Sequence, residues 1–283
     1  MRILPSILGV ALAMVSACAQ EKSDLSMRAP GAAAAELHPP SPSLSVTPYN
    51  STPRPPRVPS QFNSVRTSRR ILALTFDDGP HPELTPRLLD ILRQQGIRAT
   101  FFVVGRNVEA YPDIARRIVA EGHEIANHSW NHPDLTKLGD QGMRREVEDT
   151  TAVIERVAGR RPTTMRPPYG AINQRIREAL TKEYNLDVIL WSVDPLDWRK
   201  PGPAVVTQRL VDGAKPGGIL LAHDIQAGTI EAMPETIAQL KAKGYGFVTV
   251  SQLLALREER PAPAPATATG PVPPAPTGTL TVP

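Results

Sequence analysis

Residues 71–103, ILALTFDDGPHPELTPRLLDILRQQGIRATFFV, decide the fold of this chain. The stretch contains two apolar runs, Ile71–Phe76 and Ala99–Val103, each as long as a typical buried strand. Between them, apolar residues at helical spacing over Leu84–Gln95 predict an amphipathic helix. A strand, a helix and a strand in this order form the unit that places two strands parallel in one sheet.

The same alternation continues toward the C-terminus. Five more strands are predicted at Glu124–Asn127, Thr163–Arg166, Leu186–Trp191, Gly218–Ala222 and Gly246–Thr249. Helices are predicted at Tyr111–Glu121, Asp140–Ala158, Asn173–Lys182, Ala204–Gly213 and Ile230–Lys243. About seven parallel strands with outer helices predict an α/β fold close to a (β/α) barrel.

The two ends of the chain differ from this central part. Of 31 prolines in 283 residues, ten lie in 1–69 and eight in 261–283. Such segments are too poor in large apolar residues to repay the entropy of folding. We therefore expect a signal peptide with a lipobox-like end over 1–18 and a disordered Pro/Ala/Ser-rich tether over 19–69. One folded domain over 70–260 and a disordered Pro/Ala/Thr-rich tail over 261–283 complete the organisation.

The N-terminus predicts export. The 13 apolar residues after Arg2 are too few to span a bilayer but suit the apolar region of a signal peptide. They end in Val15-Ser16-Ala17-Cys18, which resembles a bacterial lipobox and implies acylation of Cys18. Ordinary cleavage around Ala17-Cys18-Ala19 is the alternative. We expect a protein of the periplasm or cell envelope held to a membrane by a lipid anchor alone, at the outer membrane if the cell has one.

Charge excludes one class of partner. Residues 70–260 hold 25 basic and 25 acidic side chains, so the net charge of +4 lies in 1–69. A neutral domain has no basic face to neutralise phosphates, which argues against a nucleic-acid partner. The single cysteine excludes an internal disulfide, and we expect a monomer.

The chemistry-bearing residues follow the predicted strands. The first strand ends in Asp77-Asp78, two adjacent carboxylates that repel unless a metal ion or an arginine lies beside them. The third ends in His128-Ser129-Trp130-Asn131-His132. Two imidazoles four residues apart on a helical turn face the same side, and with one carboxylate they make the three-ligand set of a catalytic zinc site.

Three more polar sets follow later strands: Arg166-Pro167-Pro168-Tyr169-Gly170, Asp194-Pro195-Leu196-Asp197-Trp198 and Leu221-Ala222-His223-Asp224. An arginine in a rigid turn could hold a carboxylate, and the carboxyl ends of parallel strands meet at one rim of a barrel. Five polar sets at five strand ends therefore predict one site.

These five motifs, TFDDGP, HSWNH, RPPYG, DPLDW and LAH, resemble the ordered motifs of the polysaccharide deacetylase family with the nodulation-protein-B homology domain. The resemblance implies a distorted (β/α) barrel that removes acetyl groups from carbohydrates with a divalent metal. Zinc is the expected ion, with cobalt, manganese or nickel as alternatives.

The resemblance also implies a role for each motif residue. Asp78, His128 and His132 would bind the metal, Asp77 would be the general base, and Arg166 would hold Asp77. His223 would protonate the leaving amine while Asp197 orients it. The backbone N–H of Tyr169 would stabilise the oxyanion, and Trp198 and Leu221 would line the acetyl or sugar pocket. No role attaches to His81.

We therefore expect a metal-dependent N-deacetylase of a GlcNAc-containing envelope polysaccharide, either peptidoglycan or a chitin-like oligosaccharide. Two alternatives stay open at this point. An O-acetyl esterase on xylan would use the same residues, and a non-catalytic wall-binding module would keep the fold and the metal.

Overall fold

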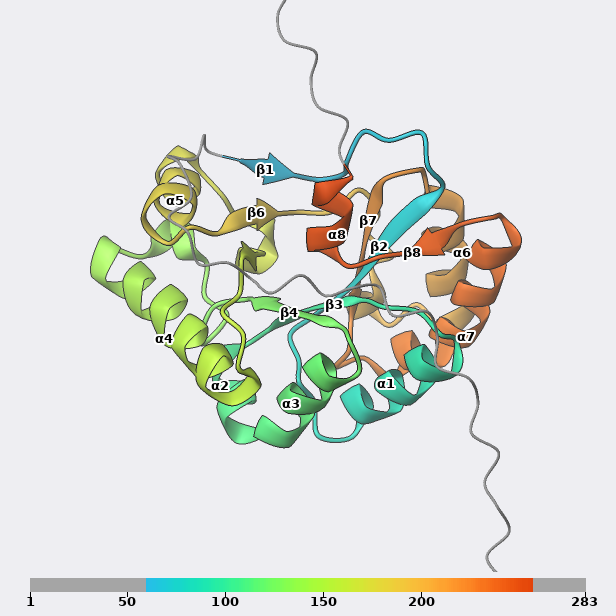
Figure 1. Ribbon diagram of the computed structural model, residues 1–283, viewed down its shortest axis with the longest axis horizontal. Coiled ribbons are helices and arrows are strands. Elements are labelled where there is room, and N and C mark those ends of the chain that lie inside the picture. Colours follow the sequence, from blue (N-terminus) through green and yellow to red (C-terminus); the bar gives the residue numbers. More distant parts are fainter. Residues whose placement is uncertain (1–59, 257–283) are drawn as a thin grey trace, which may run out of the picture. The chain divides into compact units, whose positions relative to one another are not determined.

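The computed structural model describes residues 60–256, whose strands form one parallel sheet (Figure 1). The strands are β1 (Gln61–Phe62), β2 (Ile71–Asp77), β3 (Thr100–Val103), β4 (Glu124–Asn127), β5 (Thr164–Met165), β6 (Asp187–Ile189), β7 (Gly218–His223) and β8 (Gly246–Phe247). Their order is β1-β6-β5-β4-β3-β2-β7, and β8 also pairs with β2. Each ladder between these strands is parallel, which confirms the predicted α/β class.

The sheet curls into a distorted barrel. Two isolated bridges, Ser64 to Gly218 and Val193 to Leu220, link the segments that follow β1 and β6 to β7 at the opposite edge. All seven predicted strands are present, and β1 is an eighth.

The start of the folded chain differs from the sequence expectation. Strand β1 lies within 19–69, the segment assigned to the tether, and Val65 is only 4% exposed. The fold therefore begins before Arg70. The predicted signal peptide, Cys18, most of the tether and the tail lie outside the described residues.

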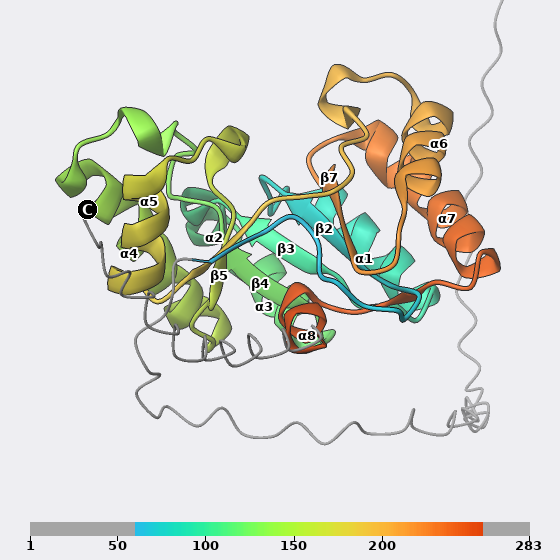
Figure 2. The same cartoon turned by 90° about the horizontal axis from the view of Figure 1, so that it is seen from above.

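The helices are α1 (Leu84–Gln94), α2 (Gly105–Ala110), α3 (Pro112–Ala120), α4 (Asp140–Ala158), α5 (Gln174–Glu178), α6 (Pro203–Gly213), α7 (Ala227–Ala242) and α8 (Val250–Ala255). Figure 1 shows α1, α3 and α4 along one side of β3 and β4, with α8 on the other, and Figure 2 shows α6 beside α7. Helices α2 and α8 are not predicted from the sequence because six residues are too few to show a helical period. Within 60–256 no helix is both long and apolar enough to cross a membrane.

The core has an outer and an inner layer, and the two faces of β2 contribute to different layers. Leu72, Leu74 and Phe76 pack outward with the helices, whereas Ala73 belongs to an inner cluster that includes residues of α8. Since side chains alternate along a strand, Thr75 and Asp77 share the inner face with Ala73. Strand β2 therefore delivers Asp77 to the interior of the barrel, at the rim where the strands end.

Candidate active site

The two carboxylates after β2 point to different places. Asp77 is the last residue of the strand and is 3% exposed. Asp78 has a left-handed backbone with φ of 77°, and its carbonyl oxygen accepts a hydrogen bond of 2.8 Å from Asn107 Nδ2. The two carboxylates nevertheless approach the same imidazole, because His128 Nε2 lies 3.7 Å from Asp77 Oδ2 and 3.4 Å from Asp78 Oδ1.

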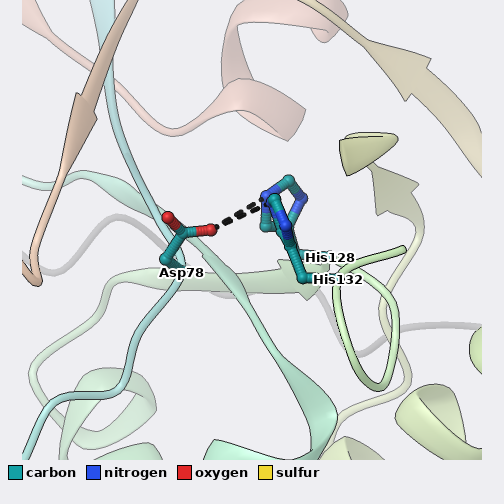
Figure 3. Close-up of side chains that lie close together, drawn as sticks. All are labelled: Asp78, His128 and His132. Carbon is teal, nitrogen blue, oxygen red and sulfur yellow. Dashed lines mark ion pairs between the residues drawn. The ribbon is translucent and has the colours of Figure 1, made fainter. Parts of the chain in front are cut away.

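The two histidines after β4 converge on Asp78, as Figure 3 shows. His128 Nε2 lies 3.4 Å and His132 Nε2 3.2 Å from Asp78 Oδ1. The expected helical turn is wrong, however. The segment is a loop in which Ser129 and His132 have φ of 67° and 63°, and this irregular backbone brings the imidazoles together with ring centroids 4.8 Å apart.

These three residues fit a divalent metal ion. They form a group of His and Asp whose candidate ligand atoms all lie within 4.8 Å of one another. His128 Nδ1 lies 2.6 Å from the carbonyl oxygen of Arg166, which can only accept, so Nδ1 carries the proton and Nε2 faces Asp78. Asp78 Oδ1 is buried without a hydrogen-bond donor among the described residues. Imidazole lone pairs and a carboxylate oxygen at such distances repel unless a cation lies among them.

Charge around Asp78 favours its ionised form. Burial alone would raise the pKa of this carboxyl, but His128, His223 and His132 outweigh burial and lower it to about 2. A carboxylate that stays ionised over the ordinary pH range suits a metal ligand.

Arg166 holds Asp77. Its side chain is fully buried, and Nη1 donates to Asp77 Oδ1 at 2.6 Å and to Thr75 Oγ1 at 2.8 Å. Nη2 and Nε donate to the carbonyl oxygens of Leu190 and Ile189. The guanidinium also lies 4.1 Å from the ring centroid of Phe102, which fixes its plane. These hydrogen bonds hold the Arg166 guanidinium and the Asp77 carboxylate in one relative orientation.

A second carboxylate–imidazole pair lies at the end of β7. His223 Nδ1 lies 2.7 Å from Asp197 Oδ1, while Asp197 Oδ2 accepts from the His223 backbone N–H and from Thr229 Oγ1. Burial would lower the pKa of His223, but Asp197 and the two carboxylates Asp77 and Asp78 raise it to about 9. His223 therefore carries a proton at neutral pH.

The three expected pocket residues differ in exposure. Tyr169 is 70% exposed, has φ of 61°, and packs its ring edge-to-face on His132 with centroids 4.6 Å apart. Trp198 is 48% exposed and carries the Arg199 guanidinium 4.6 Å from its ring centroid. Leu221 is 3% exposed within β7. Two aromatic rings are thus open to solvent, and Leu221 offers little of its surface.

Two residues beside the motifs, Asp224 and His81, have no role assigned from the sequence. Asp224 is fully buried, and burial together with the charges of Asp78 and Asp77 raises its pKa to about 7. Its Oδ2 accepts from Thr85 Oγ1 at 2.5 Å. His81, which has no assigned role, accepts at Nδ1 from the backbone N–H groups of Glu83 and Leu84 at the start of α1. The contact between Asp224 and Thr85 joins residues 139 positions apart, so the local sequence does not predict it.

Comparison with known proteins agrees with this geometry. A family model described as polysaccharide deacetylase matches residues 64–189. The chain is 41% identical over 199 residues to the peptidoglycan-N-acetylmuramic acid deacetylase PdaC of Bacillus subtilis, covering 70% of this chain and 42% of that protein. It therefore spans about two fifths of the length of that relative.

Two further matches cover most of the similar protein. A chitooligosaccharide deacetylase of Rhizobium leguminosarum bv. trifolii is 36% identical, with 69% of this chain and 87% of that protein covered. A solved structure of a peptidoglycan N-acetylglucosamine deacetylase superposes with a TM-score of 0.67 at 36% identity, covering 71% of this chain and 95% of the other. The family model covers the first three motifs, TFDDGP, HSWNH and RPPYG, and ends before DPLDW and LAH.

Proposed function

The chain belongs to the polysaccharide deacetylase family, and from this premise we propose that it is a metal-dependent hydrolase of N-acetyl groups on a GlcNAc-containing cell-envelope polysaccharide. The observation that carries the proposal is the site itself. Asp78, His128 and His132 face one another beside two charged pairs, Asp77 with Arg166 and His223 with Asp197. Relatives named for peptidoglycan and for chitooligosaccharides support the substrate class.

We assign the metal to Asp78, His128 and His132, with zinc as the ion and cobalt, manganese or nickel as alternatives. Nitrogen and carboxylate ligands in a set of three are typical of catalytic zinc. When bound, such an ion polarises a carbonyl group and makes water more acidic.

The chain's own residues then divide the proton transfers. Asp77, held by Arg166 so that its free oxygen Oδ2 faces the site, takes a proton from the attacking water. The water oxygen adds to the acetyl carbon, and the backbone N–H of Tyr169 donates to the oxyanion. His223, protonated at neutral pH, gives its proton to the leaving nitrogen as the C–N bond breaks. Acetate and a free amine are the products.

The cellular location of the protein is part of the proposal. Acylation at Cys18 would hold the domain near the cell wall, where peptidoglycan is the nearest acetylated polymer. The aromatic rings of Tyr169 and Trp198, both open to solvent, suit contact with sugar rings along such a polymer.

The test measures acetate released by the full chain from GlcNAc oligomers, peptidoglycan fragments and acetylated xylan. New amines are counted in the same samples. We expect acetate and amine in equal amounts, loss of both after chelation, and recovery when zinc is added back. Acetate without amine would instead identify an esterase, and binding without acetate would identify a wall-binding module.

A matched pair of variants ties the activity to the site. Asp77→Asn removes the proposed base and should lower kcat by about 10²–10⁴-fold, the usual contribution of a general base. Asp113→Asn changes an exposed aspartate that pairs with Arg116 on α3, and should leave kcat unchanged. Equal activity in both variants would contradict the assignment of Asp77.

A further inference from the structure

We propose that Glu146 on α4 is a positioning residue that fixes the loop between His128 and His132 and thereby sets the metal affinity of the site. The inference rests on the proposed function of this loop as the metal-binding segment. Glu146 lies outside the five motifs, 14 positions after His132 in the chain.

The loop needs support from outside because its backbone is irregular. Ser129 and His132 both have positive φ, a conformation that non-glycine residues rarely adopt without other contacts. Neighbouring segments hold its carbonyl groups: the N–H of Gly105 donates to Ser129 O at 2.9 Å, and the N–H of Arg106 donates to Trp130 O at 3.3 Å.

Glu146 holds the amide groups of the same loop. Its Oε2 accepts from the backbone N–H of Trp130 at 2.7 Å and from that of Asn131 at 2.8 Å, while Oε1 accepts from Asn131 Nδ2 at 3.2 Å. Two successive amides thus converge on one carboxylate oxygen. Hydrogen bonds to an ionised acceptor are about twice as strong as neutral ones, so this contact is the firmest that the described structure gives to the middle of the loop.

Other hydrogen bonds connect the loop to the start of its own segment and to the proposed ligand His132. His132 N–H donates to Ser129 Oγ at 3.0 Å, and Ser129 N–H donates to Asn127 Oδ1 at 2.8 Å. Asn127 in turn donates through Nδ2 to the carbonyl oxygen of Val147, the residue next to Glu146 on α4. One turn of α4 therefore anchors both the start and the middle of the loop that presents the two imidazoles.

Loss of Glu146 should weaken metal binding because a metal site tolerates only small changes in the positions of its ligands. Metal–ligand distances vary by only about 0.2 Å, and losing a residue that orients ligands typically costs about 10–100-fold in affinity. Without Glu146 the amides of Trp130 and Asn131 lose their acceptor, and the loop is free to relax toward ordinary backbone angles. The two Nε2 atoms would then separate.

The experiment measures the affinity of the folded full chain for Zn²⁺ by competition with a chromophoric chelator, together with the visible spectrum of the Co²⁺ form. We expect Glu146→Gln, which keeps one acceptor oxygen, to weaken Zn²⁺ binding by about 10-fold and Glu146→Ala by up to about 100-fold. The Co²⁺ spectrum should change in shape because the ligand geometry changes.

Two control variants separate positioning from general stability. Glu148→Gln lies on the same helix, where Glu148 is exposed and pairs with Arg144, and it should bind Zn²⁺ as the unaltered chain does. Asn131→Ala removes only the 3.2 Å side-chain bond and keeps both amide bonds, so its affinity should fall by less than that of Glu146→Gln. Circular dichroism of the metal-free proteins checks that each variant is folded.

The outcomes also distinguish this inference from the proposed function. Zn²⁺ affinity within twofold of the unaltered chain in both folded Glu146 variants would overturn the positioning role, whatever the activity. Tight metal binding that depends on Glu146, in a chain that releases no acetate, would leave the positioning role in place and overturn the deacetylase proposal.

Discussion

At the scale of single residues, the protonation of His223 depends on one neighbour. Asp197 receives four hydrogen bonds, from His223 Nδ1, the backbone N–H groups of His223 and Trp198, and Thr229 Oγ1, so its carboxylate is fixed and ionised. Its pKa is lowered because these donors outweigh burial. The proposed acid therefore stays charged at pH values where an ordinary histidine is neutral.

Replacing this carboxylate should shift the pH dependence of activity. An acid must be protonated, so activity should fall as pH rises through the pKa of His223, about 9. In Asp197→Asn the main cause of the raised value is lost while burial remains, and the alkaline limb of kcat/KM should move from about 9 toward the ordinary 6.5. A pH profile of kcat/KM for both proteins measures this shift. Thr229→Val removes one bond to Asp197 but keeps the charge, and its limb should stay close to that of the unaltered chain.

The buried pair of Arg166 and Asp77 makes a prediction about stability. Arg166→Met leaves Asp77 buried without its partner, and should lower the free energy of unfolding by about 3–5 kcal/mol. Urea denaturation measures this loss. The double variant Asp77→Asn with Arg166→Met should recover part of it because no charge is then stranded. Arg156→Met, at an exposed pair with Glu109, should cost less than about 1 kcal/mol.

Sequence reasoning reaches the residues of the motifs but not their supports. Asp77 and His128 directly follow predicted strands and Arg166 ends one, and parallel strands bring their ends to one rim. Glu146 and Thr229 carry no such signal, because their partners lie far along the chain and a helical glutamate or threonine is ordinarily a surface residue.

At the scale of elements, the packing of α2 against the histidine loop depends on a missing side chain. A Cβ atom on Gly105 would lie 2.5 Å from Trp130 Cε3 and 2.7 Å from Thr150 Oγ1. Helix α2 begins at this residue, and its N–H donates to Ser129. Glycine therefore allows the helix, the loop and α4 to meet.

Gly105→Ala should displace Trp130 and with it the loop. We expect a loss of about 1–3 kcal/mol in the free energy of unfolding, the usual cost of overpacking, and weaker Zn²⁺ binding. Gly142→Ala is the matched control with the opposite sign. Gly142 lies inside α4, and a Cβ atom on it would lie at an ordinary contact distance of 3.5 Å from Leu138 Cβ. Alanine should therefore raise the free energy of unfolding by about 0.5–1 kcal/mol. Thermal and urea unfolding of both variants measure the contrast, and destabilisation by both would contradict the argument.

The elements also show where pattern reasoning stops. Long periodic segments such as Asp140–Ala158 are predicted to the residue, since 19 residues give five turns of consistent period. The histidine loop was predicted as a helical turn because four-residue spacing suits one. The same spacing occurs in a loop with two positive φ values, and periodicity cannot distinguish the two.

At the scale of the whole molecule, residues 60–69 belong to the fold. Strand β1 pairs with β6, Ser60 Oγ donates to Asp187 Oδ1 at 2.7 Å, and Val65 N–H donates to Gly217 O at 2.8 Å. Composition placed this stretch in the tether because a two-residue strand after a proline-rich run has no periodicity of its own. The other seven strands are predicted correctly because the polarity of the sequence changes sharply where each of them begins and ends.

A chain that begins at Arg70 should therefore be less stable than one that keeps residues 58–69. Burial of Val65 alone is worth about 1.5–3 kcal/mol, and the pairing of β1 adds to it. Urea denaturation of both forms measures the difference. Equal free energies of unfolding would show that β1 contributes nothing, and the boundary predicted from composition would then hold for stability.

The place of β2 in the sheet has a consequence for how the chain comes to be folded. This strand is the first of the long strands to leave the ribosome, yet it pairs with β7 and β8, which lie some 140 to 180 residues later. One edge of β2 stays unpaired until β7 has been synthesised. Such late closure is slow and leaves an open edge exposed in the meantime. We therefore expect the nascent chain to complete this part of the sheet only after β7 and β8 have been synthesised.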